Sequence, residues 1–155
     1  MTLDSRGKPH IAYFDPVRLD LKYAQWTGMN WSIERVAEAG SVGWWPSIAL
    51  DSSDKPHISY HDDNVDVLMH SRWTGSNWST ETVDSARPTG AYSSIVLDSL
   101  DRPHISYHNW SWDTGALKYA RWTGANWAFE TIDASSYVIY GTEIVLDSFD
   151  RPHVV

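Results

Sequence analysis

LDSSDKPHISY, the stretch from Leu50 to Tyr60, decides the fold because the chain contains it, with small changes, four times. The other copies begin at Leu3, Leu97 and Leu146, so the intervals between successive copies are 47, 47 and 49 residues. Self-similarity at such a period is typical of repeat architectures, in which one supersecondary unit cannot bury its own faces and stacks on copies of itself. The sequence therefore predicts a repeat fold along the whole chain.

Each full copy continues into a second repeated phrase, Trp-Thr-Gly-x-Asn-Trp, and then reaches a glutamate three residues past the second tryptophan. This phrase spans Trp26 to Trp31, Trp73 to Trp78 and Trp122 to Trp127. We therefore treat residues 1–155 as a single domain, with repeats of approximately 1–46, 47–93 and 94–142 and a partial repeat of 143–155.

One copy predicts four short strands. Apolar and β-branched residues occupy Ser47 to Leu50, His57 to His61, Leu68 to Trp73 and Trp78 to Val83, and clusters of turn-forming residues separate them. Pro56 opens the second strand, where a missing amide donor is tolerated. Four antiparallel strands joined by tight turns make one blade of a β-propeller, so the predicted fold class is an all-β propeller of about three blades and the start of a fourth.

The phrases LDSxxxPHISY and LKYAxWTG resemble a β-propeller repeat found in many bacterial and archaeal multi-blade proteins, mostly of unassigned function. The likeness covers essentially the whole chain. It implies the fold and no particular activity. The copies lack the Ser-x-Asp-x-Gly-x-Thr-Trp box of sialidase-type propellers and the Gly-His and Trp-Asp pairs of the WD40 repeat.

Composition restricts the classes of partner. The 155 residues are 42% hydrophobic and carry a formal charge of −8, with Lys and Arg scattered singly, which argues against nucleic acid as a partner. There is no cysteine, no apolar run long enough to span a membrane, and no signal-peptide pattern at the N-terminus. These features are compatible with an extracellular or cell-surface location if the chain is part of a longer protein.

Three blades are too few for a closed ring, because propellers typically use four to eight. A shorter stack leaves strand edges and aromatic faces exposed. We therefore expect two copies to associate and close a ring. The alternative is that the chain is one segment of a longer array of blades.

The candidate ligand site lies on the face where the loops differ between the copies. One face carries nearly invariant turns, whereas the loops of the other face vary in sequence and hold every tryptophan outside the repeated phrase. The candidate ligand-binding residues there are Trp44, Trp45, Trp110, Trp112, Tyr92, Tyr137, Tyr140, His61, Asp62, His108, Asn109 and Asp113.

Aromatic rings beside carboxylates and amides are typical of sugar or peptide sites, because a ring packs on the apolar face of a pyranose while polar groups bind its hydroxyls. The predicted function is a non-catalytic module that binds carbohydrate or, as an alternative, peptide. Three alternatives remain: a scaffold whose loop aromatics only cover the core, a glycosidase that uses two of Asp62, Asp63 and Asp113, and a cation site near His61 and His108. We expect no cofactor, no metal and no enzymatic activity, since nucleophile-elbow, phosphate-loop and zinc-protease motifs are missing.

The invariant residues predict structural roles. His10, His57, His104 and His153 each follow a proline, six residues past an aspartate, which predicts a buried histidine held by a carboxylate. The paired tryptophans of Trp-Thr-Gly-x-Asn-Trp predict aromatic packing between adjacent blades. A sugar pocket between each neighbouring pair of blades is the alternative role for these tryptophans.

Overall fold

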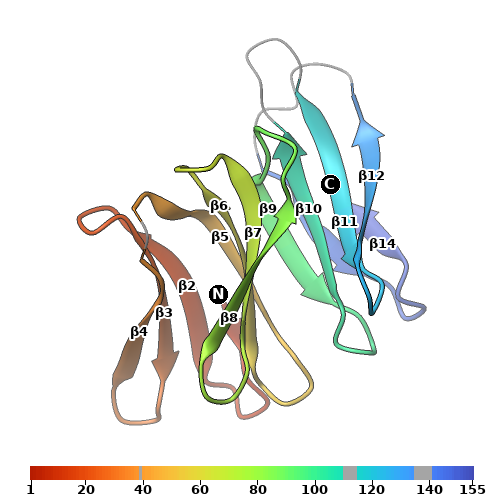
Figure 1. Ribbon diagram of the computed structural model, residues 1–155. Coiled ribbons are helices and arrows are strands. Elements are labelled where there is room, and N and C mark those ends of the chain that lie inside the picture. Colours follow the sequence, from red (N-terminus) through yellow and green to blue (C-terminus); the bar gives the residue numbers. More distant parts are fainter. Residues whose placement is uncertain (39, 110–114, 135–140) are drawn as a thin grey trace.

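The computed structural model describes residues 1–38, 40–109, 115–134 and 141–155 (Figure 1). These residues form fourteen strands and no helix, and therefore contain no helix that could cross a membrane. The strands are β1 (Thr2–Leu3), β2 (Pro9–Asp15), β3 (Asp20–Trp26), β4 (Trp31–Ala37), β5 (Val42–Leu50), β6 (Pro56–Asp62), β7 (Val67–Trp73), β8 (Trp78–Asp84), β9 (Ala91–Leu97), β10 (Pro103–Asn109), β11 (Ala116–Trp122), β12 (Trp127–Asp133), β13 (Ile144–Leu146) and β14 (Pro152–Val154).

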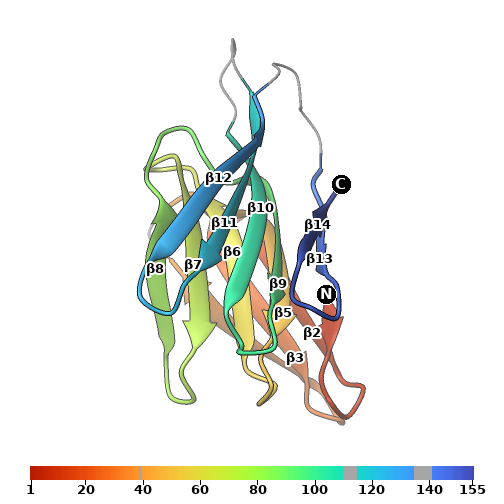
Figure 2. The same cartoon turned by 90° about the vertical axis from the view of Figure 1, so that its right-hand side faces the viewer.

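The strands form three four-stranded antiparallel sheets and one two-stranded sheet, each in chain order. We call them blade 1 (β1–β4), blade 2 (β5–β8), blade 3 (β9–β12) and partial blade 4 (β13–β14). Figures 1 and 2 show the blades standing side by side, with the inner strands β5 and β9 in contact. The predicted all-β propeller architecture is confirmed, and the described sheets form an open arc.

The tight turns between the third and fourth strands explain the Thr-Gly-x-Asn sequence. In blade 2 the Thr74 hydroxyl lies 2.9 Å from the Asn77 carbonyl oxygen and 2.6 Å from Asn77 Oδ1, and the amide of Thr74 donates to the same carbonyl. Gly75 has φ of 103°, a backbone conformation that residues with a side chain rarely adopt. The register then places Trp73 opposite Trp78. We call the end of the blades with these turns the turn face and the opposite end the loop face.

A repeated clamp joins neighbouring blades at the turn face. The serine of the Leu-Asp-Ser phrase donates its amide and its hydroxyl to an aspartate of the following blade: Ser52 to Asp101 at 2.8 and 2.6 Å, with matching pairs from Ser5 to Asp54 and from Ser99 to Asp150. These three aspartates have φ of 59° or 60°, which Asp tolerates better than most residues. The clamp fixes the distance and angle between blades.

Apolar packing between blades supplies the core. Leu21 and Tyr23 of blade 1 are buried against Ile48, Ile58 and Tyr60 of blade 2. The same arrangement recurs one blade further along the chain. The inner strands approach the preceding blade closely, since a Cβ atom at position 43, a glycine, would lie 2.6 Å from Leu21 Cβ.

The structure corrects the placement of three aromatic residues. The sequence predicts Trp44, Trp45 and Tyr92 in loops, but they belong to the inner strands β5 and β9. The pairing of β5 with β6 is irregular on both sides of Trp44, and Trp45 and Tyr92 have φ of 48° and 52°. Irregular pairing of this kind leaves no period-2 signal in the sequence, so the strand start was missed.

Candidate functional site

The histidines of the repeated phrase form a buried network in blades 1 and 3. His104 Nδ1 lies 2.5 Å from the Tyr119 hydroxyl, and His104 Nε2 lies 3.5 Å from Asp98 Oδ2. His10 makes the matching contacts, at 2.6 Å with Tyr23 and 3.8 Å with Asp4. Burial lowers the pKa of both histidines. The buried position predicted for His10 and His104 is confirmed, and the tyrosine partner is a contact that the sequence did not reveal. The same prediction is wrong for His153, which is exposed because partial blade 4 has only two strands.

Blade 2 replaces that tyrosine with a second histidine. His57 Nδ1 lies 3.1 Å from His70 Nε2, and His70 Nδ1 lies 3.0 Å from Glu81 Oε1. Burial and the neighbouring His70 lower the pKa of His57 to about 4. Burial likewise lowers the pKa of His70. The result is a chain of two imidazoles that ends on a carboxylate.

Two clefts lie between neighbouring blades, and nine repeat positions line both of them. Cleft 1, between blades 1 and 2, encloses about 410 Å³ and is lined by Asp4, Arg6, Tyr23, Gln25, Glu34, Ser53, Asp54, Lys55, Pro56 and Trp73. Cleft 2, between blades 2 and 3, encloses about 470 Å³ and is lined by Asp51, His57, His70, Arg72, Ser79, Glu81, Leu100, Asp101, Arg102, Pro103 and Trp122. The repeat thus builds corresponding clefts between blades 1 and 2 and between blades 2 and 3.

Three side chains give cleft 2 its chemistry. Arg72 and Glu81 come from β7 and β8 of blade 2, and Trp122 comes from β11 of blade 3. The Trp122 ring is fixed by an edge-on contact with Trp127, at 5.6 Å between ring centroids. In cleft 1 the corresponding residues are Gln25, Glu34 and Trp73.

The tryptophan pairs play two parts. Within each pair the rings meet edge-on inside one hairpin, in addition to the predicted packing between blades. The second tryptophan also reaches the preceding blade, where Trp78 meets Tyr23 and Trp127 meets His70. The first tryptophan lines the cleft, as Trp73 and Trp122 show. The two tryptophans of a pair lie opposite each other on adjacent antiparallel strands, which explains why their rings meet within the hairpin.

Most charged side chains around cleft 2 stay ionised and have a hydrogen-bond partner within the protein, and Arg72 is the exception among those described. Arg102 Nε donates to Asp98 Oδ2 at 2.6 Å, and Asp101 is occupied by the clamp. The hydrogen bond from His70 is the main cause that lowers the pKa of Glu81, so its carboxylate stays ionised. Arg72 is exposed, and among the described residues no carboxylate oxygen lies within 4.0 Å of its guanidinium. Its N–H donors are therefore available to a ligand.

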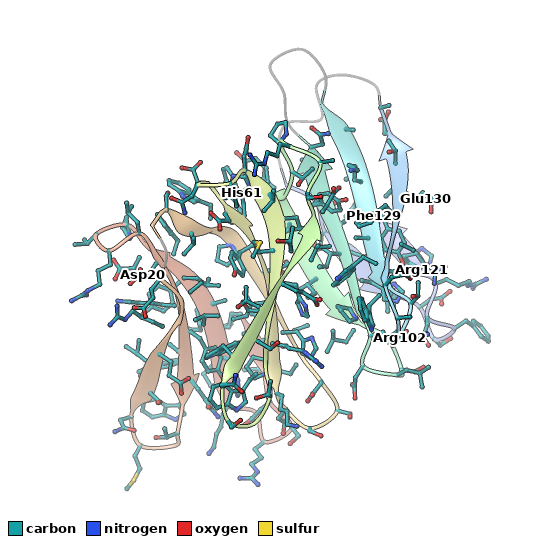
Figure 3. All side chains as sticks on the ribbon, viewed as in Figure 1. Asp20, His61, Arg102, Arg121, Phe129 and Glu130 are labelled. Carbon is teal, nitrogen blue, oxygen red and sulfur yellow. The ribbon has the colours of Figure 1, made fainter. Side chains whose placement is uncertain are left out.

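Figure 3 labels His61, Arg102 and two residues of blade 3 that correspond to residues of cleft 2. His61 lies at the loop face of blade 2, and Arg102 lies at the turn face of blade 3. Arg121 and Glu130, the counterparts of Arg72 and Glu81 in blade 3, lie on its outer strands.

The predicted site on the loop face has a different character. Stacked and tilted rings form a row there: Phe14 meets Trp44 at 4.4 Å, and Trp45 meets Tyr92 at 4.7 Å. All four rings are partly buried, so much of their surface is used in packing. Asp62 and Asn109 end β6 and β10 beside this row.

Two of the predicted ligand residues lie below that surface. His61 and His108 are each 1% exposed. His61 Nδ1 donates to the carbonyl oxygen of Thr89 at 2.8 Å, and the Trp45 ring lies over His61 at 5.6 Å. His61 Nε2 lies 3.9 Å from Asp63, and no group of three or more metal-ligating side chains occurs among the residues that the structure describes. The remaining predicted residues, Trp110, Trp112, Asp113, Tyr137 and Tyr140, lie outside the described residues.

Sequence reasoning did not select Arg72 and Glu81, and it included Trp122 only in its alternative of a sugar pocket between neighbouring blades. Their repetition suggested structural residues, since variation between copies was taken as the mark of a site. The available signal was the spacing: every copy places a glutamate three residues past the second tryptophan, at a strand position that faces the next blade.

Comparisons with known proteins agree with this architecture. A fucose lectin from Kordia zhangzhouensis, in complex with methyl-fucoside, matches 86% of the chain and 97% of its own chain with a TM-score of 0.58 and 18% identity. The R-to-A triple mutant of AofleA from Arthrobotrys oligospora matches 83% of the chain with a TM-score of 0.58 and 8% identity, and the match spans 39% of that protein. No family model and no curated protein sequence matches the chain. The fold therefore defines the chain as a propeller assembled from four-stranded blades, with clefts between the blades.

Proposed function

We propose that the chain is a non-catalytic carbohydrate-binding module that holds one pyranose in each cleft between blades. The observation that carries the proposal is cleft 2, where Arg72, Glu81 and Trp122 converge in about 470 Å³. An indole ring packs on the apolar C–H face of a sugar, a carboxylate accepts hydrogen bonds from its hydroxyls, and a guanidinium donates to its oxygens.

The charges favour a neutral sugar over an acidic one. Three carboxylates line cleft 2, from Asp51, Glu81 and Asp101, against the two guanidiniums of Arg72 and Arg102. An anionic ligand would therefore meet an excess of like charge, which carries a free-energy cost in a partly buried site.

Binding is proposed in preference to catalysis because a single carboxylate remains free to face the ligand. Asp51 accepts the amides of Ser53 and Lys55, and Asp101 accepts both donors of Ser52. A glycosidase typically needs two carboxyl groups across the scissile bond. Glu81 alone does not meet that requirement.

The solved structures support a sugar as ligand, since a propeller of similar fold is a fucose lectin in complex with methyl-fucoside. Cleft 1 repeats the arrangement with Gln25, Glu34 and Trp73. Two sites on one rigid stack engage a multivalent glycan with an avidity that exceeds the affinity of either site.

A glycan array followed by calorimetric titration with methyl pyranosides, methyl-fucoside among them, tests the proposal. Trp73→Ala combined with Trp122→Ala should abolish saturable binding, because both clefts lose their stacking ring. Trp31→Ala is the matched control, since Trp31 occupies the repeated phrase but lines neither cleft. Trp45→Ala reports on the loop face. Full binding in the double variant, with loss in Trp45→Ala, would move the site to the loop face.

A further inference from the structure

Among blades 1 to 3, only blade 2 replaces the tyrosine of the buried histidine network, and the replacing residue lines cleft 2. The position of Tyr23 in blade 1 and of Tyr119 in blade 3 is occupied by His70 in blade 2. His70 is 2% exposed and packs edge-on against Trp127, at 5.8 Å between ring centroids. Both of its ring nitrogens have a hydrogen-bond partner, as is usual for buried polar groups.

The hydrogen bonds assign protons along the network. A tyrosine hydroxyl has one proton to give. In blades 1 and 3 the hydroxyl lies within 2.6 Å of the histidine Nδ1 and donates this proton to it. The tyrosine therefore has no proton left to donate to the glutamate of its blade. His70 has two ring nitrogens. Its Nδ1–H donates to Glu81 Oε1, while its Nε2 accepts from His57 Nδ1–H. His70 therefore connects the buried network to the carboxylate of the cleft.

The two clefts consequently hold their glutamates in different ways. In cleft 1, Glu34 Oε2 accepts the indole N–H of Trp78 at 3.3 Å, a long hydrogen bond. In cleft 2, the equivalent indole N–H of Trp127 faces Glu81 and helps to lower its pKa without a close hydrogen bond, and Glu81 is bonded to His70 at 3.0 Å. Glu81 is thus fixed by a shorter, charge-assisted bond from a buried ring.

Building on the proposed sugar-binding function, we propose that cleft 2 is the higher-affinity site and that His70, held by His57, is a positioning residue for the Glu81 carboxylate. A carboxylate that is already oriented loses less conformational entropy when it accepts ligand hydroxyls. Arg72 adds a charged donor where cleft 1 has the neutral Gln25. Both differences raise the affinity of cleft 2 relative to cleft 1.

The surroundings of His70 determine how this site responds to pH. The charged and titratable groups that act on His70 are His57, Glu81 and Arg72, and Asp51, Asp101 and Arg102 line the same cleft. The hydrogen bond from His70 lowers the pKa of Glu81, so the acceptor remains ionised as the pH falls. Removing that donor should shift the acid loss of binding at cleft 2 to higher pH.

The test uses His70→Tyr in a Trp73→Ala background, so that cleft 2 is measured without cleft 1. Calorimetric titration with the tightest of the methyl pyranosides is repeated across the acid range. We expect affinity to fall about tenfold, as for the loss of one hydrogen bond to a charged group. We also expect the acid limb of the binding curve to move to higher pH. A purely structural role of His70 would leave that limb in place.

Two further variants keep the proposal testable if His70→Tyr folds poorly. His70→Asn retains an N–H donor near the position of Nδ1, and it should restore affinity to within about threefold of the parent. Tyr23→His in a Trp122→Ala background transfers the relay to cleft 1, beside His10 and Glu34, and should raise the affinity of that cleft. Thermal melts of each variant confirm that the propeller is intact.

The outcomes separate this inference from the function on which it rests. No saturable binding of any methyl pyranoside to the unmodified chain would refute the proposed function itself. Binding by the unmodified chain with an unchanged affinity and pH profile in His70→Tyr would overturn only the role of His70. Equal affinities of the two clefts, measured in the Trp73→Ala and Trp122→Ala backgrounds, would overturn the ranking of the sites.

Discussion

Acidification should destabilise the folded chain in a pH range where carboxylates are still ionised. The cause is the set of buried histidines. Burial lowers the pKa of His57 from its ordinary value of about 6.5 to about 4. It lowers the pKa of His10, His70, His104 and His108 in the same direction. The unfolded chain therefore takes up protons at a higher pH than the folded chain does.

The sign and the magnitude follow from linkage. Because the pKa of His57 is lower in the folded state, its contribution to stability is complete above about pH 6.5 and is lost as the pH falls toward about 4. A difference of about 2.5 between the two pKa values corresponds to about 3 kcal/mol, at about 1.4 kcal/mol for each unit. The four other histidines add to this loss.

Urea unfolding followed by tryptophan fluorescence, at a series of pH values between about 7.5 and 4.5, measures this effect. His57→Gln removes one titrating ring, so its free energy of unfolding should depend less steeply on pH, by up to about 1.4 kcal/mol for each pH unit. Glu38→Gln, an exposed change, is the control and should keep the parent slope. A free energy of unfolding that is constant from pH 7 to pH 5 would refute the reasoning.

Two further predictions concern the blade interfaces. Asp101→Ala removes both clamp bonds of Ser52 and places alanine, which tolerates positive φ less well than aspartate, at φ of 59°, so it should lower the free energy of unfolding by about 2 kcal/mol. Asp101→Gly should cost less, since glycine accepts that backbone, and equal losses in chemical denaturation would discount the strain. Self-association should bury the open face of blade 1, where Trp31 and Ile33 are 43% and 59% exposed. Light scattering should therefore report a dimer, and Ile33→Lys should weaken it. A monomer at high micromolar concentration would contradict this prediction.

The repeat determined the architecture without any structure. Thr74 and Asn77 fix a turn by local hydrogen bonds, and Pro56 opens a strand by its own covalent geometry, so these features could be read from neighbouring residues. The burial of His104 beside Asp98 was also predictable, because the same pair recurs at the same spacing in each copy. The strand start at Trp44 and Trp45 was not, since irregular pairing hides the alternation on which the prediction depends.

The tertiary structure decided where the proposed ligand clefts lie. Arg72 and Glu81 lie on one blade and Trp122 on the next, so their convergence depends on the angle between two stacked sheets, and no local pattern encodes that angle. The same stacking buried His61 and His108, which sequence reasoning had placed in exposed loops. His70 meets His57 across the β6–β7 strand pair inside blade 2, a contact between residues thirteen apart in sequence. The sequence by itself determined the blade, through contacts within about ten residues, whereas the clefts arise from packing between blades.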